Sequence, residues 1–215
     1  MHRVPMCSMA MNQVDAILIS NWNSLLALLF HTECTGFCRR VFASEPTLQY
    51  GTLMMEELME YFERVTNDKS DYVWKDPEVY AHFLNPPDRS PLEWREMYSE
   101  DTMRRSLERV KVVAFTQPVT IDGNIKATSC CSGYAIGACN WITAKASERF
   151  GYISASANRS LHTRAVDWKP FKDLDTMAVT SLCPLQDNNP EKIAMTLMCA
   201  VEDTVKAQGS VILPV

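Results

Sequence analysis

Two apolar runs joined by a short polar turn constrain most strongly what this chain can fold into. The first run, Val14 to Ile19, is short and contains β-branched residues, which predicts a buried strand. The second run, Leu25 to Phe30, predicts the start of a buried helix. The turn between them, Ser20 to Ser24, follows the carboxyl end of the strand, where α/β folds usually bind their ligands. The side chains of this turn are therefore the first candidates for a functional site.

The composition is that of an ordinary globular protein. The chain has 215 residues, of which 47% are hydrophobic and 22% charged, so it can bury a core. Its net charge of −5 argues against a stand-alone nucleic-acid binder, which needs a basic face to neutralise phosphates, but leaves a local basic patch open. Eight scattered cysteines indicate a reducing compartment. No stretch approaches the roughly 20 apolar residues of a membrane span, so we expect a soluble, intracellular protein.

A long helix with one acidic face is the clearest element of the first half. Ser44 is a good N-cap, and Glu45 and Pro46 suit a first turn, so we expect a helix from about Glu45 to Val65, after a short strand at Val41 to Ala43. We expect its buried face to carry Met54, Leu58, Tyr61, Phe62 and Val65, and its solvated face to carry Glu56, Glu57, Glu60 and Glu63.

The second half predicts a meander of about four antiparallel strands. Asp122-Gly123-Asn124 contains the Asp-Gly pair that is a strong hairpin signal, and Ser132 to Ala138 is a tight loop of small residues. The expected strands are Lys111 to Ile121, Ile125 to Cys131, Cys139 to Thr143 and Phe150 to Ser154. Elsewhere we expect short helices within Tyr72 to Leu84 and over Asp101 to Val110, a strand over Met177 to Leu182, a helix from Asn189 to about Ala207, and a last strand from Ser210 to Val215.

Both ends of the chain look cut relative to a complete fold. Met1 to Gln13 is Met-rich without a clear period, and we expect a loose leader there. The chain then enters a buried strand at once, and such a strand needs neighbours on both sides. It also ends inside a predicted strand. We therefore expect a domain that leaves apolar surface exposed.

Residues that could carry metal or nucleophilic chemistry are few and poorly spaced. His31, Cys34 and Cys38 have a spacing similar to that of zinc ligands, but no fourth ligand lies near them in sequence. Cys130 and Cys131 are adjacent, which places them on opposite faces of a predicted strand. Other candidates without a placed partner are Ser132, Arg39, Arg40, Arg104 and Arg105.

Three segments closely resemble the metallo-β-lactamase-fold proteins that process RNA 3′ ends. They are Ser20-Asn21-Trp22-Asn23 after the first strand, Ser132 to Trp141, and Phe150 to Ser156. Four further segments are similar to the same family: Thr35-Gly36-Phe37, Ala43 to Thr47, Met54 to Leu58 and Gly209 to Val215. The similarity covers about Val14 to Val215.

The resemblance implies a fold and its limits. The fold is an α/β metallo-β-lactamase-like αββα sandwich, in an incomplete form. Residues 14–215 would be a part of that domain, and residues 1–13 an unmatched leader. The family's opening strands and the β-CASP domain that follows would be absent.

The resemblance also assigns the polar loops to the places where active relatives bind metal. Those relatives carry His-x-His-x-Asp-His after the first strand, then a further histidine and a bridging aspartate. The corresponding positions here are Asn21, Asn23, Leu25, Leu26, Tyr134 and Ala155. Amides are poor ligands for zinc and leucine has no donor atom, so we expect no catalytic zinc and no other cofactor.

A non-catalytic role follows from the resemblance. It implies a scaffold subunit that pairs with a catalytic nuclease subunit in a nuclear assembly, one that processes small nuclear RNA 3′ ends and cleaves nascent transcripts. Contact with RNA stays open. One alternative is the inactive subunit of the mRNA polyadenylation cleavage machinery. Another is a metal-dependent RNA hydrolase with an atypical site, which would have to use Asp15, Glu33, Glu45 or His31.

Overall fold

Two compact units make up the part of the chain that the structure describes. The structure is a computed structural model, and it describes residues 10–67, 76–80, 82, 99–157, 164–180 and 189–213. The first unit is Met1–Ser181 and the second is Leu182–Val215. Each unit is described by itself.

The first sheet consists of three short parallel strands, β1 (Ala16–Leu18), β2 (Arg40–Ala43) and β3 (Val110–Val112), in the order β1-β2-β3. Side chains of a strand alternate between its two faces. Val41 and Ala43 accordingly pack against the helices, whereas Phe42 packs toward the second sheet. Among the described residues β1 has one neighbour, β2, and its residues are half-buried. β1 is thus an edge strand among the described residues, and it is less buried than its apolar sequence predicts.

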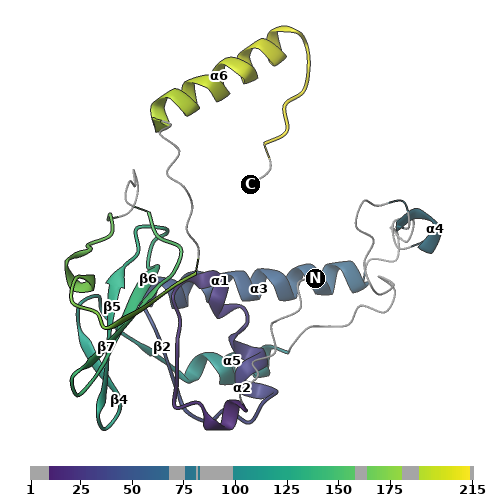
Figure 1. The fold of residues 1–215 in the computed structure, drawn as a ribbon. Coiled ribbons are helices and arrows are strands. Elements are labelled where there is room, and N and C mark those ends of the chain that lie inside the picture. Colours follow the sequence, from purple (N-terminus) through teal and green to yellow (C-terminus); the bar gives the residue numbers. More distant parts are fainter. Residues whose placement is uncertain are drawn as a thin grey trace. The chain divides into compact units, whose positions relative to one another are not determined.

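Four helices cover one face of this sheet (Figure 1). They are α1 (Trp22–Leu25), α2 (Leu28–Glu33), α3 (Glu45–Asn67) and α5 (Glu100–Glu108). A short 3₁₀ turn, Met11–Gln13, precedes β1, and α4 (Pro77–Tyr80) lies within the range where a short helix was expected. The helix expected over Leu25 to Phe30 is interrupted: α1 ends at Leu25 and α2 begins at Leu28, and hydrogen bonds with the tighter i→i−3 spacing join them.

Helix α3 begins where its cap predicts, but its buried face differs from the expected one. The hydroxyl of Ser44 accepts a hydrogen bond from the amide of Thr47, as an N-cap should. Met54 and Tyr61 are 38% and 54% exposed. The buried positions are instead Thr47, Gly51 and Met55, and the four glutamates are exposed as predicted. Apolarity alone missed this face because two of its members are small or polar.

Gly51 explains why the buried face contains so small a residue. A Cβ atom at Gly51 would lie 2.2 Å from Cδ2 of Leu25. The glycine therefore lets α3 approach α1 closely, and Leu25 fills the space that a larger side chain would take.

The second sheet has five strands in the order β4-β5-β6-β7-β8. They are β4 (Pro118–Asp122), β5 (Ile125–Cys131), β6 (Cys139–Lys145), β7 (Glu148–Ile153) and β8 (Thr176–Val179). The first four pair antiparallel, and β8 pairs parallel to β7. The predicted meander and the hairpin at Asp122-Gly123-Asn124 are confirmed.

The single strand expected over Lys111 to Ile121 is wrong. The first residues of that range belong to β3 in the first sheet, and the last belong to β4 in the second. The chain crosses between the sheets at Thr116, whose φ is +64° and whose amide donates to the carbonyl of Ser129. Alternation continues through the crossing because Val113 and Phe115 are both packed into the core between the sheets.

The core between the two sheets makes them face-to-face layers. Phe42 from the first sheet packs with Trp141, Ala127 and Cys139 from the second. The predicted α/β class is confirmed, with a helical layer on the outer face of the first sheet.

A short segment, residues 164–175, is tied to β7. It contains the 3₁₀ turn Lys169–Phe171, and Arg149 on β7 donates to the carbonyls of Pro170 and Asp173. A Cβ atom at Gly151 would lie 2.3 Å from Cδ1 of Leu174, so this glycine lets the segment lie directly on the strand.

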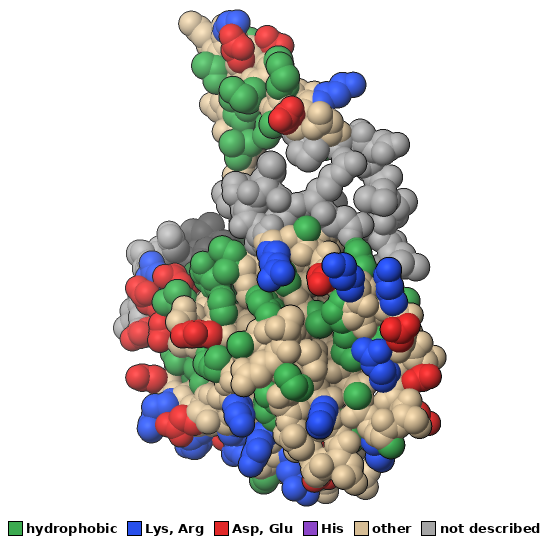
Figure 2. Space-filling view, turned by 90° about the vertical axis from the view of Figure 1, so that its left-hand side faces the viewer, with side chains coloured by type: hydrophobic (Ala, Val, Ile, Leu, Met, Phe, Trp, Pro, Cys, Tyr) green, Lys and Arg blue, Asp and Glu red, His purple; other side chains and the backbone are tan. Residues whose placement is uncertain are grey.

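The second unit contains one amphipathic helix, α6 (Pro190–Lys206), with Asn189 as its N-cap. Large apolar side chains are exposed along it (Figure 2), namely Ile193, Met195, Leu197, Met198 and Val205. The strand expected from Ser210 to Val215 is wrong for residues 210–213, which have no strand pairing, and the last two lie outside the described residues. No described helix has the length and apolarity to cross a membrane.

A buried hydroxyl pair between α2 and α5 gives a stability prediction. Thr32 donates to Ser106 over 2.8 Å, and both residues are buried. Thr32→Val should lower the free energy of unfolding by about 1–3 kcal/mol, because Ser106 loses its partner in an apolar place. The double variant Thr32→Val with Ser106→Ala should lose less stability than the sum of the losses in the two single variants, as measured by urea unfolding. Strictly additive losses would contradict the pairing.

Candidate functional site at the junction of the strand ends

Loops from the ends of several strands meet at one place, which we call the strand-end junction. It comprises Ser20–Asn21 after β1, Ser44–Thr47 after β2, Ser132–Asn140 between and into β5 and β6, and Ser154–Ala157 after β7. The Cys139 amide donates to the Ser20 carbonyl over 2.7 Å, and the Ala157 amide donates to the Ser132 carbonyl over 2.9 Å. The junction is thus where the family resemblance places the functional loops.

Asn140 is the fully buried polar centre of the junction. Its Oδ1 accepts from the amide of Ser154 over 2.9 Å, and its Nδ2 donates to the hydroxyl of Ser156 over 3.0 Å. The Ser154 hydroxyl in turn donates to the carbonyl of Cys139 over 3.0 Å. Every one of these groups is neutral and has a partner, which is how a buried polar cluster avoids a large desolvation cost.

A close contact with α3 fixes the other side of the junction. The hydroxyls of Ser44 and Thr47 both donate to the carbonyl of Gly137, over 2.6 and 3.1 Å. Gly137 has a φ of +80°, and a Cβ atom there would lie 2.8 Å from Cβ of Pro46 and from the Thr47 amide nitrogen. Only glycine satisfies both this backbone conformation and this spacing.

The end of β1 is bonded to the second sheet through buried groups. The indole N–H of Trp141 donates to the carbonyl of Ile19 over 3.1 Å. Together with the bond between Cys139 and Ser20, this joins the two sheets through the two backbone carbonyls that directly follow β1. We call these two bonds the inter-sheet bonds.

Three of the six predicted site positions come to the junction. Asn21 lies at the start of α1, where its Oδ1 accepts from the amide of Ser24 over 3.0 Å. Tyr134 is 53% exposed on the loop between β5 and β6, and its amide donates to the Ser132 hydroxyl. Ala155 is half-buried and directly follows Ser154.

The other three predicted positions do not meet there. Leu25 is completely buried in the core between the first sheet and its helices. Leu26 is partly buried against the cluster of Leu29, Met55 and Met103. Asn23 is exposed in α1.

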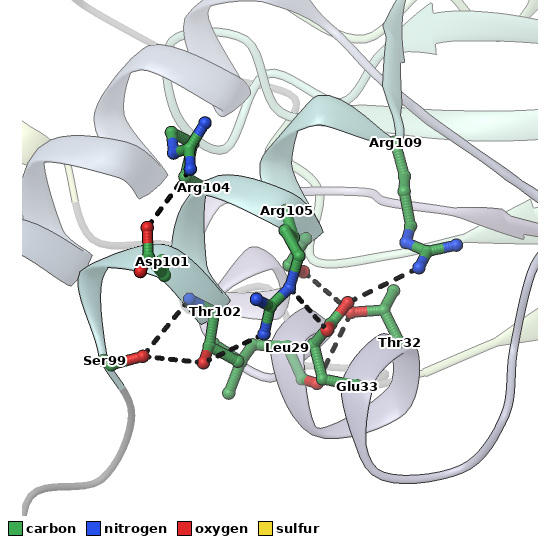
Figure 3. Close-up of polar contacts among 10 residues, drawn as sticks. Leu29, Thr32, Glu33, Ser99, Asp101, Thr102, Arg104, Arg105 and Arg109 are labelled. Atoms are coloured by element: carbon green, nitrogen blue, oxygen red, sulfur yellow. Dashed lines mark hydrogen bonds and ion pairs between the residues drawn. The ribbon is translucent and has the colours of Figure 1, made fainter.

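The acidic residues that an atypical metal site would need are dispersed. Glu33 forms ion pairs with Arg105, over 3.3 Å, and with Arg109, over 3.6 Å (Figure 3). Asp15 and Glu45 are exposed, and His31 is half-buried on α2. In the part of the chain that the structure describes, no three His, Cys, Asp or Glu residues are grouped to hold a metal ion.

The arginine pair on α5 is engaged in ion pairs. Figure 3 shows Arg104 turned toward Asp101, and it also pairs with Glu108. The hydrogen bond that Arg104 donates to the carboxylate of Asp101 is the main cause that raises the pKa of Arg104. Arg105 is bonded to Glu33, and both arginines remain exposed to solvent.

The adjacent cysteines Cys130 and Cys131 lie on opposite faces of a strand, as the sequence predicted. Cys130 is buried and Cys131 half-buried, on opposite faces of β5. Burial raises the pKa of Cys130 to about 11 and also raises the pKa of Cys139. Both thiols therefore stay protonated at neutral pH and are poor metal ligands. Cys34 and Cys38 are exposed.

A shallow cleft of about 310 Å³ lies beside β1. Its walls are mostly apolar, and His31 is the one titratable imidazole among them. The lining residues are Ile17, Leu18, Ile19, Ser20, Ser24, Ala27, Leu28, His31 and Tyr152.

Sequence reasoning missed Asn140, Thr47 and Gly137 as the residues that hold the junction. A signal was available for two of them. Asn140 is an amide in a predicted buried strand, which must find partners, and Gly137 lies in a loop of small residues. Their partners, however, are distant in sequence and could not be assigned.

Comparisons with known proteins confirm the sequence relationship that the motifs predicted. No protein-family model matches the chain. The chain is similar to Integrator complex subunit 9 of Xenopus laevis and of Homo sapiens, at 33% identity over 207 residues. Each alignment covers 95% of this chain and 31% of the relative. The homolog in Dictyostelium discoideum is 27% identical over 220 residues.

The solved structures that match are distant. Zinc-bound PqqB from Methylobacterium extorquens matches with a TM-score of 0.35 at 12% identity, covering 68% of this chain and 40% of that one. A B3 metallo-β-lactamase with an active-site glutamic acid matches with a TM-score of 0.34 at 12% identity, covering 95% and 56%.

The chain is thus a relative of a subunit of a multiprotein complex. The particular relative is Integrator complex subunit 9. This chain spans about a third of the length of the curated relatives it matches.

Glycine substitutions test the close contact at the junction. Gly137 and Gly36 have similar positive φ values, +80° and +74°, but a Cβ atom at Gly36 would meet nothing within 4 Å. Gly36→Ala should cost about 1–2 kcal/mol through its backbone conformation alone. Gly137→Ala should cost about 1–3 kcal/mol more, because the added carbon clashes with Pro46 and Thr47. Equal losses in chemical unfolding would contradict the contact.

Proposed function

We propose that this chain acts as part of a non-catalytic scaffold subunit of the Integrator complex in the nucleus. The relationship to Integrator complex subunit 9 supports this assignment. Residues 14–215 are then a part of a metallo-β-lactamase-like domain, and residues 1–13 a leader outside it. The relatives in Xenopus laevis, Homo sapiens and Dictyostelium discoideum are all Integrator subunits, which favours that assembly over the polyadenylation cleavage machinery.

The non-catalytic part of the proposal rests on the structural roles of the residues at the predicted metal-ligand positions. Leu25 is committed to the hydrophobic core, and Asn21 is committed to capping α1. Around them the junction presents serine, threonine and asparagine groups bonded to one another. Neutral groups of this kind supply neither the negative charge nor the donor geometry that a two-metal hydrolytic centre needs.

The partner that the resemblance implies is the catalytic nuclease, Integrator complex subunit 11. In this proposal the chain shapes the assembly that processes small nuclear RNA 3′ ends and cleaves nascent transcripts. In this role the chain contributes a binding surface and no catalytic residues.

The exposed face of α3 is the contact surface that we assign to this role. Apolar and aromatic side chains lie exposed there, and acidic residues flank them. The apolar set is Tyr50, Leu53, Met54 and Tyr61, and the acidic set is Glu56, Glu57, Glu60 and Glu63. The face also carries Arg64, which pairs with Glu60 over 3.4 Å, so acidic residues are in excess there. A face that combines exposed aromatic residues with an excess of acidic ones suits a partner with basic and apolar groups.

Co-purification with Integrator complex subunit 11 tests the proposal. The chain, in the longest form that its coding sequence gives, should co-purify with that subunit. The double variant Leu53→Arg with Tyr61→Arg should weaken the association about tenfold or more, equivalent to about 1.4 kcal/mol. Met177→Arg, at an equally exposed position on β8, should leave it unchanged.

The outcomes separate the two parts of the proposal. Failure of the unmodified protein to associate contradicts the scaffold role. Association that survives the α3 double variant contradicts the contact surface alone.

Restoring two histidines tests whether the metal site is lost beyond simple repair. The double variant Asn21→His with Asn23→His should bind zinc no more tightly than the unmodified chain, because Leu25 and Ala155 still have no donor atom and Tyr134 still replaces a histidine. Calorimetric titration with zinc at neutral pH measures this. Stoichiometric binding by the double variant, with the roughly 10 kcal/mol or more of a structural zinc site, would show that the site is nearly intact.

A further inference from the structure

Cys131 and Cys139 face each other across the pair of strands β5 and β6. They are partners in register, at the point where the loop Ser132–Ala138 joins the two strands. The Ser132 amide donates to the Ala138 carbonyl, whereas the Cys139 amide donates to Ser20. Hydrogen-bonded and non-hydrogen-bonded pairs alternate along an antiparallel ladder, so Cys131 and Cys139 form a non-hydrogen-bonded pair.

The spacing of such a pair suits a disulfide. Residues opposite each other in a non-hydrogen-bonded pair have Cα atoms about 4.5 Å apart and side chains on the same face. Disulfides span Cα separations of roughly 4.4–6.8 Å. Only a small approach of the two Cβ atoms, and rotation about χ1, is then needed to join the sulfurs.

Both thiols are free and bonded to different backbone carbonyls. The Sγ of Cys131 donates to the carbonyl of Arg164 over 3.2 Å, and the Sγ of Cys139 donates to that of Ile19 over 3.5 Å. Cys131 is half-buried, whereas Cys139 is completely buried. Cys131 is therefore the one that a small oxidant reaches first.

We propose that Cys131 and Cys139 are a modification site that a peroxide converts into a cross-strand disulfide. In the first step the Cys131 sulfur attacks one peroxide oxygen, the O–O bond breaks, and a sulfenic acid and one water form. In the second step the Cys139 sulfur attacks the Cys131 sulfur, the S–O bond breaks, and the hydroxyl leaves as water with the proton of Cys139. Overall two thiols lose two electrons and two protons, and one hydrogen peroxide becomes two waters.

The disulfide would change what holds the strand-end junction. Both thiol hydrogen bonds are lost on oxidation. The Ile19 carbonyl keeps the indole N–H of Trp141, so the inter-sheet bonds survive. The carbonyl of Arg164 loses its bond to Cys131, which removes one of the contacts that tie the segment 164–175 to the second sheet. Oxidation would thus lock the β5–β6 end of the junction while loosening the segment beside it.

Cys130 provides a matched control within the same strand. It is adjacent to Cys131 but lies on the opposite face, and its register partner is Asn140 rather than a cysteine. All three cysteines fall between Lys126 and Lys145, with no other lysine or arginine between, so one tryptic peptide reports on them together.

The test is peptide mass spectrometry on the full chain. The protein is treated with hydrogen peroxide, unfolded, alkylated and digested with trypsin. The peptide 127–145 should carry one alkyl group instead of three, and apart from these groups its mass should be two hydrogen atoms below that of the reduced peptide. Reduction with dithiothreitol followed by a second alkylation should restore all three alkyl groups. Cys130→Ser should keep the link, and Cys131→Ser should abolish it.

Three results would overturn the proposal. One is a peptide that keeps three alkyl groups at a peroxide dose that oxidises the exposed Cys34 or Cys38. The second is a disulfide that Cys130→Ser abolishes, because that disulfide would involve Cys130 and not Cys131. The third is Cys131 oxidised to a sulfinic acid while Cys139 is still alkylated, which would show that the two sulfurs do not meet.

Discussion

The two inter-sheet bonds are the constraint on which the rest of the structure depends. The carbonyls of Ile19 and Ser20 directly follow β1, a strand of only three residues. They accept hydrogen bonds from Trp141 and Cys139 of the other sheet. A buried carbonyl left without a donor costs about 1–3 kcal/mol, so these acceptors fix how β1 lies against β6. A sheet of three short strands is stable only when its hydrophobic face is covered, and these bonds hold it against its cover.

Hydrogen bonds within the strand-end junction limit which ligands it can bind. In an α/β arrangement, strand ends are where ligands usually bind, and here four loops meet at that place. Their polar side chains form hydrogen bonds within the junction. Asn140 bonds to Ser154 and Ser156, and Ser44 donates to the backbone carbonyl of Gly137. A junction whose neutral groups are satisfied from within has little left for a ligand or a metal. Under the scaffold role that we propose, the contacts lie on exposed surface, and α3 and α6 are where large apolar side chains are exposed together.

Local signals predicted the elements, and long-range contacts decided the rest. The Ser44 cap located the start of α3, and the Asp-Gly pair located the β4–β5 hairpin, because each acts within a few residues. The strand expected over Lys111 to Ile121 failed because Val113 and Phe115 keep alternating while the chain changes sheets. The buried face of α3 failed because Gly51 is buried for the space it leaves to Leu25, which no apolarity pattern records. At the site, the residue types at Asn21 and Leu25 could be read from the sequence, but the partners of Asn140 could not, since they lie in the loop after β7.

Hydrogen exchange at the junction tests the central claim most directly. If the junction is closed by its own bonds, the amides of Cys139 and Ser154 should exchange only when the whole first unit unfolds. Their exchange free energies should then equal the global free energy of unfolding, although both residues lie at the ends of strands. The exposed turn amides of Gly36 and Gly123 serve as the fast reference. Exchange at Cys139 and Ser154 as fast as at those glycines would show an open junction, with polar groups free for a ligand, and would contradict the account.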